Sequence, residues 1–294
     1  MCISFVVRSL VSRYNGIIHG DIYLFSHLCL WNCIGSFLNV VIFRYHSGAT
    51  FLGRSMCFSC GKTLRWHDLV PIFSFAALRG KCRFCLSKIS WQYAAVEILT
   101  SALFVLFFWK VGGVAALQNT ASFSYFANLV FLFTLGSLLV VIAGYDIKHK
   151  IIPDAFAYSF AALAFLGLIF FPTLAPTPLD FFAGPLLALP FAFLWYVSGG
   201  RWMGLGDAKL ALGIGWFLGL KAGIVAVILA FWIGAIFGLA LVAIGKLSAT
   251  PFFSSILRRR ITMKSEIPFA PFLIVGLLIV FFVPYVMETA TGLL

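Results

Sequence analysis

Long apolar stretches alternate with short polar ones along almost the whole chain. About 20 consecutive apolar residues span a bilayer as a helix, because a helix satisfies its own backbone hydrogen bonds in hydrocarbon. The pattern predicts an all-α polytopic membrane protein with about eight transmembrane helices. The sixth of them is short and is expected to tilt or to thin the bilayer locally. The predicted spans are residues 23–43, 91–111, 126–143, 154–171, 181–197, 208–220, 222–245 and 268–287.

Composition supports this class. The chain is 62% hydrophobic and only 10% charged, which is too much apolar surface for a soluble globular protein. A net charge of +12 would favour nucleic acid as the partner of a soluble domain. Here the basic residues lie in loops between spans, so we expect contact with membrane lipid and no nucleic acid.

The charge distribution also predicts an orientation. If the spans alternate, 17 of the basic residues lie on the side that carries the polar segment 45–90, and four lie on the other side. Because Lys and Arg accumulate on the cytoplasmic side of membrane proteins, segment 45–90 is predicted to be cytoplasmic. Both termini are then outside, and the polar turn 145–153 and the turn 198–207 face the cytoplasm.

Segment 45–90 contains two Cys-x2-Cys pairs separated by 21 residues. This spacing is typical of a zinc ion held by four thiolates, here Cys57, Cys60, Cys82 and Cys85. In a reducing compartment, metal binding is favoured over disulfides. Four protein ligands leave no open position, so the zinc would be structural. Reduced thiols without a metal are the alternative.

Four of the nine acidic residues are candidates for a functional site. Asp146, Asp154 and Asp207 fall at the predicted cytoplasmic ends, and Glu97 falls inside the second span. Carboxylates near hydrocarbon are usually paired, solvated at the interface or functional. For each acid alone, a solvated helix end is the simpler interpretation, and Asp154 after Pro153 is explained equally well as a helix start.

Two acids on adjacent helix ends suggest chemistry. Two close carboxylates can share one proton, so that the ionised one activates water and the protonated one donates to a scissile carbonyl. Asp146 and Asp207 would hydrolyse a peptide bond in this way. Gly204 and Gly206, on either side of Leu205, would let an extended peptide approach the backbone closely.

These motifs, in this order, resemble the bacterial type IV prepilin peptidases, within the wider group of Gly-x-Gly-Asp intramembrane aspartic proteases. Two positions depart from the family pattern: Phe58 stands where proline is common, and Leu86 stands where glycine is common. The resemblance rests on Gly35–Arg44, the two cysteine pairs, Gly80–Arg83, Trp91–Glu97, Asp146–Asp154, Gly204–Lys209 and Glu266–Phe272.

The resemblance implies that Asp146 and Asp207 are the catalytic pair. They would cleave basic leaders from prepilins and pseudopilins at the cytoplasmic face of the bacterial inner membrane, typically after a glycine. It also implies methylation of the new N-terminal residue, with S-adenosylmethionine as the methyl donor. Glu97 and the loop 44–90 are associated with that second activity. Asp154, Lys209 and Glu97 would be supporting residues, and Gly204 and Gly206 would admit the substrate.

The expected organisation has four parts: an N-terminal lead (1–24), a first transmembrane helix (25–44), a cytoplasmic zinc-binding loop domain (45–90) and a transmembrane aspartic peptidase domain (91–294). Three alternatives remain open at this point. The chain could be a peptidase without methyltransferase activity, a transporter that uses intramembrane carboxylates, or an assembly scaffold organised by zinc.

Overall fold

The computed structural model of the chain is mainly helical in the residues that it describes, and among them there is no strand apart from two isolated bridges. The described residues are 19–45, 53, 55–57, 59–70, 72–113, 123–170, 178–247 and 268–291. The all-α class is confirmed. Residues 1–18 of the predicted lead and residues 248–267, whose basic residues entered the charge count, lie outside the described part.

Within the described part, four helices are long and apolar enough to cross a membrane. They are α4 (Trp91–Lys110), α6 (Phe123–His149), α8 (Pro178–Ser198) and α9 (Leu205–Leu247). Helix α7 (Asp154–Phe170) is apolar but shorter, as is the stretch Ala270–Val283 of α10 (Ala270–Thr291). The chain is therefore a multi-pass membrane protein, and the count of about eight spans stays a prediction.

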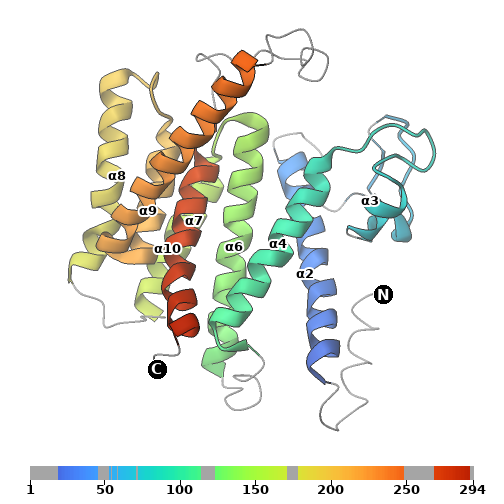
Figure 1. Cartoon of the computed structure of the whole chain (residues 1–294), viewed down its shortest axis with the longest axis horizontal. Helices are drawn as coiled ribbons and strands as arrows, with labels where there is room; N and C mark the ends of the chain where they lie inside the picture. The colour runs from blue at the N-terminus through green and yellow to red at the C-terminus, as the bar shows by residue number, and fades with distance from the viewer. Residues whose placement is uncertain are drawn as a thin grey trace. The chain divides into compact units, whose positions relative to one another are not determined.

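The chain divides into two compact units, Met1–Val140 and Val141–Leu294. In the first unit, α2 (His19–Arg44) packs against α4 (Figure 1). Trp31 of α2 lies in an aromatic core with Phe104 and Phe108 of α4. The helices come close at Gly35, where a Cβ atom would lie 2.9 Å from the Cα atom of Glu97. A glycine at this position lets the two backbones approach each other.

The second unit is built around α9, which packs against α7, α8 and α10 (Figure 1). Small residues make these contacts possible. A Cβ atom at Gly213 would overlap Phe160 of α7, one at Gly215 would overlap Ala183 of α8, and one at Gly276 of α10 would overlap Ala226 of α9. Close contact through small residues is the usual way in which helices associate in lipid.

Helix α9 is interrupted at Gly219, whose φ of 77° and ψ of 173° are not helical. Glycine adopts this backbone conformation without the steric cost that a side chain adds. The break lies next to the predicted boundary between the sixth and seventh segments, so the expected division of 208–245 into two apolar pieces is confirmed.

The end of α6 differs from the prediction. A polar turn was expected from Tyr145 to Pro153, but α6 continues to His149. Lys148 and His149 occupy its last turn, where basic residues complement the helix dipole. Lys150, with a φ of 57°, ends the helix, and its N–H donates to the carbonyl of Asp146 at 2.7 Å. Asp146 therefore lies on the last turn of a helix.

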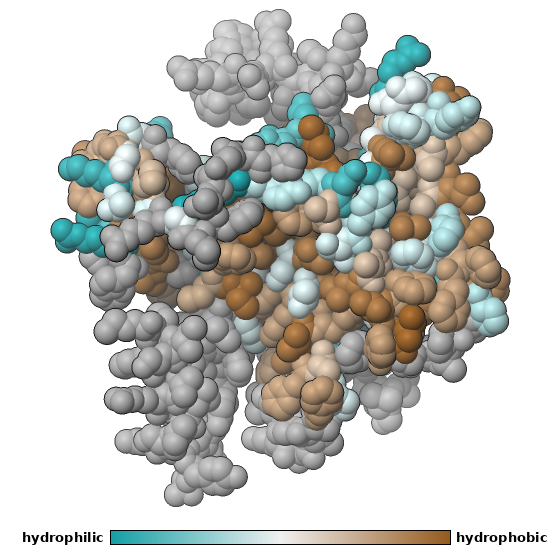
Figure 2. Space-filling view, turned by 180° about the vertical axis from the view of Figure 1, so that it is seen from behind, coloured by the Kyte–Doolittle hydropathy of each residue, from teal (hydrophilic) through white to brown (hydrophobic). Residues whose placement is uncertain are grey.

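Apolar side chains cover much of the outer surface in the view of Figure 2. On α8 and α9 they include Phe182, Leu189, Trp232 and Leu239, which are all more than half exposed. Such surfaces are unfavourable in water and are expected of helices whose outer faces contact lipid.

Candidate active site and metal-binding loop

Asp146 and Asp207 are both buried, with exposed fractions of 5% and 8%. Asp146 comes from the end of α6 and Asp207 from the first turn of α9, and both belong to the unit Val141–Leu294. They lie close enough for the negative charge of Asp146 to act on Asp207. The structure thus brings together two acids that are 61 positions apart in the sequence.

Backbone groups hold both carboxylates. Asp146 Oδ2 accepts the N–H of Ala270, the first residue of α10, at 3.1 Å. A helix N-terminus favours a negative charge, because its N–H groups lack intrahelical acceptors. The carboxylate of Asp207 is hydrogen-bonded to the backbone of Gly204, whose carbonyl accepts the N–H of Asp207 at 3.2 Å. A carboxylate accepts up to about four hydrogen bonds, so both acids keep capacity for water or a peptide.

The two glycines before Asp207 have different surroundings. A Cβ atom at Gly206 would lie 2.8 Å from the Cβ atom of Ile152, which follows α6. Gly206 therefore lets the start of α9 pack against this segment. At Gly204 the nearest neighbour of an added Cβ atom would be Asp207 Oδ2 at 3.7 Å, an ordinary contact. Of these two glycines, only Gly204 therefore has space beside it for another group.

Asp154 and Lys209 form an ion pair between the start of α7 and the first part of α9. Lys209 Nζ lies 2.6 Å from Asp154 Oδ1 and 4.9 Å from the centre of the Tyr158 ring. The Asp154 side chain is mostly exposed. Exposed ion pairs contribute at most about 1 kcal/mol, so this one positions the two helices more than it stabilises the fold.

Glu97 of α4 links the loop domain to the helices of its own unit. Its buried carboxylate accepts the N–H of Ile72 at 2.8 Å and is hydrogen-bonded to the Ser36 side chain. Ile72 has a φ of 61°, a left-handed conformation that is strained for a β-branched residue. The hydrogen bond that Ile72 donates to Glu97 helps to hold this backbone, which leads directly into α3 (Phe73–Ala77).

The four predicted zinc ligands converge in the structure. The Sγ atoms of Cys57, Cys60, Cys82 and Cys85 all lie within 4.8 Å of one another, and Cys57 Sγ is 3.8 Å from Cys85 Sγ. Tetrahedral zinc with Zn–S bonds of about 2.3 Å requires sulfur atoms about 3.8 Å apart. The donor set and its spacing therefore fit a zinc ion.

The two cysteine pairs form matching turns. The N–H of Gly61 donates to the carbonyl of Cys57 at 2.9 Å, and the N–H of Leu86 donates to the carbonyl of Cys82 at 3.0 Å. Both residues have a positive φ, 67° for Gly61 and 56° for Leu86. Leu86 thus occupies a left-handed position that glycine would adopt more easily.

Hydrogen bonds favour the thiolate form at two of the cysteines. The backbone N–H groups of Cys60 and Ser59, with the Ser87 hydroxyl, lower the pKa of Cys57 to about 6. The Ser87 hydroxyl, 3.1 Å from Cys85 Sγ, also lowers the pKa of that cysteine. Because zinc binds thiolates, these contacts favour metal binding. No motif in the sequence points to Ser87.

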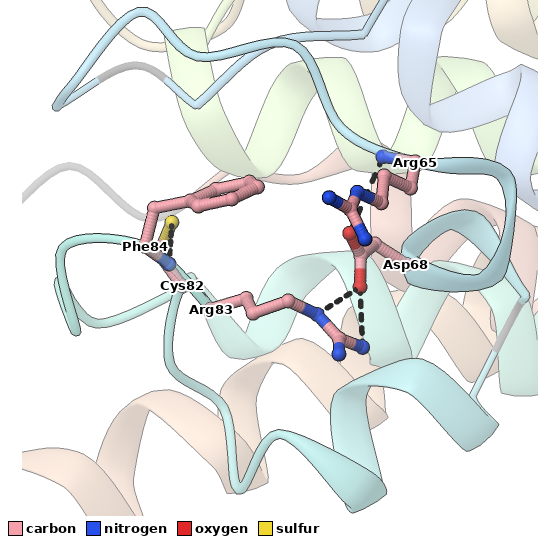
Figure 3. Close-up of polar contacts among 5 residues, drawn as sticks. All are labelled: Arg65, Asp68, Cys82, Arg83 and Phe84. Atoms are coloured by element: carbon pink, nitrogen blue, oxygen red, sulfur yellow. Dashed lines mark hydrogen bonds and ion pairs between the residues drawn. The ribbon is translucent and has the colours of Figure 1, made fainter.

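A second polar cluster braces the loop, and Figure 3 shows its contacts. The buried carboxylate of Asp68, in η1 (Trp66–Leu69), forms an ion pair with Arg83 at 2.7 Å and accepts the N–H of Arg65 at 3.2 Å. Arg83 lies inside the second cysteine pair, next to Cys82. Sequence reasoning singled out neither Asp68 nor this contact, because the two residues are 15 positions apart in an irregular loop.

Comparison with known proteins covers both halves of the chain. Residues 30–111 match the bacterial peptidase A24 N-terminal domain, and residues 133–239 match the type IV leader peptidase family. A prepilin leader peptidase/N-methyltransferase from Bacillus subtilis is 33% identical over 233 residues, which are 76% of this chain and 79% of the relative. The chain belongs to the type IV leader peptidase family.

Other relatives in this leader peptidase family carry the same name. The protein from Xanthomonas campestris is 32% identical over 76% of this chain and 69% of its own length. The protein from Myxococcus xanthus is 34% identical over 73% of this chain, and the chain spans only 62% of that relative. No solved structure matches the chain significantly.

The two leader peptidase matches separate the candidate residues into two groups. The N-terminal match contains the four cysteines and Glu97. The second match contains Asp146, Asp154, Asp207 and Lys209.

Proposed function

We propose that this chain cleaves the basic leader from type IV prepilins and pseudopilins and then methylates the new N-terminal residue. Leader cleavage and N-methylation are the activities that its family and the names of its relatives carry. The observation that best supports leader cleavage is the pair Asp146 and Asp207. One acid can act as the general base that activates water and the other as the general acid, so no nucleophilic Ser or Cys is needed.

The proposed mechanism uses one proton shared by the two carboxylates. Two buried carboxylates whose charges interact do not both ionise readily, so one stays protonated. The ionised carboxylate removes a proton from water, which attacks the scissile carbonyl. The protonated carboxylate donates to the carbonyl oxygen, which gives a tetrahedral diol. The carboxyl that took the proton from water then donates it to the amide nitrogen. The other carboxylate removes a proton from one hydroxyl, the C–N bond breaks, and the pair returns to its starting state with one shared proton. Support comes from the N–H of Ala270, which fixes one carboxylate while its other oxygen can bind water.

Two glycines have proposed roles at this site. Gly204 is the position where the peptide backbone approaches, since there is space beside it. Gly206 keeps the start of α9 against Ile152 and thereby holds Asp207 in place. Asp154 and Lys209 support the same region through their ion pair.

The proposed location is the bacterial inner membrane, with the active site on the cytoplasmic side. Support comes from the excess of basic residues on the side of segment 45–90. We retain the four expected parts, 1–24, 25–44, 45–90 and 91–294, as the proposed organisation.

Two cofactors belong to the proposal. Cys57, Cys60, Cys82 and Cys85 would hold a structural zinc ion that lets a loop with little apolar core fold. S-adenosylmethionine would supply an electrophilic methyl group when bound. Glu97 would serve this second activity by fixing the Ile72 backbone at the edge of the loop domain.

A cleavage assay tests the peptidase function. Purified protein in detergent is incubated with a prepilin, and the product is separated from the precursor by size. We expect cleavage by the wild type, and slower but measurable cleavage by Asp154→Asn, which loses only the ion pair with Lys209 and keeps both acids of the pair. Asp146→Asn and Asp207→Asn should each abolish cleavage. Full cleavage by either of these two variants would exclude the shared-proton mechanism.

A further inference from the structure

A groove runs between α8 and the second part of α9, with a volume of about 290 Å³. It is almost entirely apolar. One wall is formed by Leu186, Pro190 and Leu194, and the other includes Ile224, Ile228 and Phe231. Spacings of three or four residues place each set on a single helix face. The groove is thus a continuous feature of two helices.

A break in α9 at Gly219 and two prolines inside α8 lie beside the groove. Near Gly219 the helices are tightly packed, because Gly184 lies against Trp216 and Gly223 lies against Leu187. Beyond this region Pro185 and Pro190 interrupt the hydrogen bonding of α8, and proline in a helix usually bends it. In the groove, large apolar side chains stand at the contact between α8 and α9 in place of glycines. In Figure 1, α8 and α9 separate towards the top of the view.

The prolines also change which backbone groups are available. Pro185 has no N–H for the carbonyl of Phe181, and Trp216 Nε1 donates to this carbonyl instead, at 2.9 Å. Pro190 likewise has no N–H for the carbonyl of Leu186, a residue of the groove wall. Each proline thus removes one backbone donor from α8, which weakens the helix beside the groove and favours a bend there.

One wall of the groove reaches the candidate active site. The ring of Phe231 lies 4.9 Å from the ring of Phe269 and 6.0 Å from the ring of Phe191. Phe269 immediately precedes Ala270, whose N–H binds the carboxylate of Asp146. An apolar segment in the groove would therefore contact the residues that lead directly to the catalytic pair.

We propose that this groove binds the apolar helical segment that follows the scissile bond of the prepilin. This inference rests on the proposed peptidase function. It adds the place where the enzyme holds the part of the substrate that follows the scissile bond. A substrate chain that enters the membrane beyond the two aspartates must do so as an apolar helix, because only a helix satisfies its own backbone groups there. The groove offers such a helix two apolar walls. Lipid acyl chains are the competing occupant, and the tests below separate the two.

The first test fills the groove and compares two substrates. Leu194→Trp and Ile228→Trp add bulk inside the groove, and Leu189→Trp adds the same bulk at an exposed α8 position that does not line it. The substrates are a full prepilin and a peptide that ends a few residues after the scissile bond. We expect the groove variants to raise KM for the prepilin about tenfold, the effect of losing one large apolar contact.

The short peptide and the control variant make the result decisive. Cleavage of the short peptide by the groove variants, and of both substrates by Leu189→Trp, should remain within about twofold of the wild type. An unchanged KM for the prepilin, or an equal loss for both substrates, would overturn the inference. Failure of the wild type to cleave either substrate would instead contradict the proposed function itself.

A crosslinking experiment tests the occupant directly. A photoreactive phenylalanine derivative is placed at position 224, in a protein that also carries Asp207→Asn so that the bound prepilin is not cleaved. Irradiation in vesicles should yield an adduct whose fragments map to the apolar segment of the prepilin. Adducts with lipid alone, in the presence of saturating prepilin, would identify the groove as a lipid site and overturn the inference.

Discussion

Gly204 and Gly206 lie two residues apart and are expected to respond differently to the same substitution. In Gly206→Ala the new Cβ atom meets Ile152 at 2.8 Å. Such overpacking costs about 1–3 kcal/mol and would displace Asp207, so we expect a lower unfolding temperature and a lower kcat. Gly204→Ala has room and should keep its unfolding temperature but raise KM. Thermal unfolding in detergent with steady-state kinetics measures both, and the opposite order of effects would contradict these roles.

Leu86 offers a second test at the residue scale. It is 70% exposed and has a φ of 56°, so Leu86→Gly removes backbone strain at little cost in buried surface. Glycine loses more backbone entropy on folding, which offsets part of this gain. We expect a net stabilisation of the zinc-bound loop by about 0.5–1 kcal/mol, which corresponds to roughly two- to fivefold tighter zinc binding. Competition with a chelator measures this affinity.

Gly61 provides the matched control for Leu86, because it holds the equivalent position in the first cysteine pair, with a φ of 67° and no atom near an added Cβ. Gly61→Leu should weaken zinc binding by a similar factor. Weaker zinc binding by Leu86→Gly would show that the positive φ of Leu86 does not limit the site.

At the scale of elements, Glu97 joins α4 to the loop domain through Ile72. Glu97→Ala leaves the Ile72 N–H without this acceptor and should destabilise the loop by about 1–3 kcal/mol. Limited proteolysis of the segment around residue 72 is expected to become faster. Glu97→Gln keeps an acceptor oxygen and should keep the protection. If Glu97→Gln is protected but cannot methylate, the charge of Glu97 has a role beyond positioning.

Most elements that depend on neighbouring residues in the sequence were predicted well, and those that depend on distant residues were predicted less well. Apolar length is a local property, so α4, α8 and the break in α9 at Gly219 lie close to their predicted positions. The end of α6 was misplaced, because Lys148 and His149 look like loop residues until the helix dipole and the positive φ of Lys150 are considered.

Contacts between distant residues were predictable only in part. Cysteine spacing alone located the metal-binding cluster, and the polar positions of Asp146 and Asp207 at span ends suggested a pair. Contacts such as Gly206 with Ile152 or Asp68 with Arg83 depend on how irregular segments fold back. No periodicity in the sequence reports them.

At the scale of the whole molecule, the two activities are expected to separate. The cysteine cluster lies in the unit Met1–Val140, and Asp146 and Asp207, the proposed catalytic pair, lie in the unit Val141–Leu294. In a variant with Cys57→Ser and Cys82→Ser, loss of zinc should unfold the loop and reduce methylation by about tenfold or more, while cleavage changes much less. Metal analysis should find one zinc ion per wild-type chain. Equal loss of both activities would mean that the loop supports the whole enzyme.

The intact mass of a prepilin after incubation with the purified protein and S-adenosylmethionine tests the central claim most directly. With the wild type we predict loss of the leader and a gain of one methyl group on the mature fragment. With Asp146→Asn, and equally with Asp207→Asn, we predict only the uncleaved precursor. A cleaved product from either aspartate variant, or an unchanged precursor with the wild type, would contradict the account.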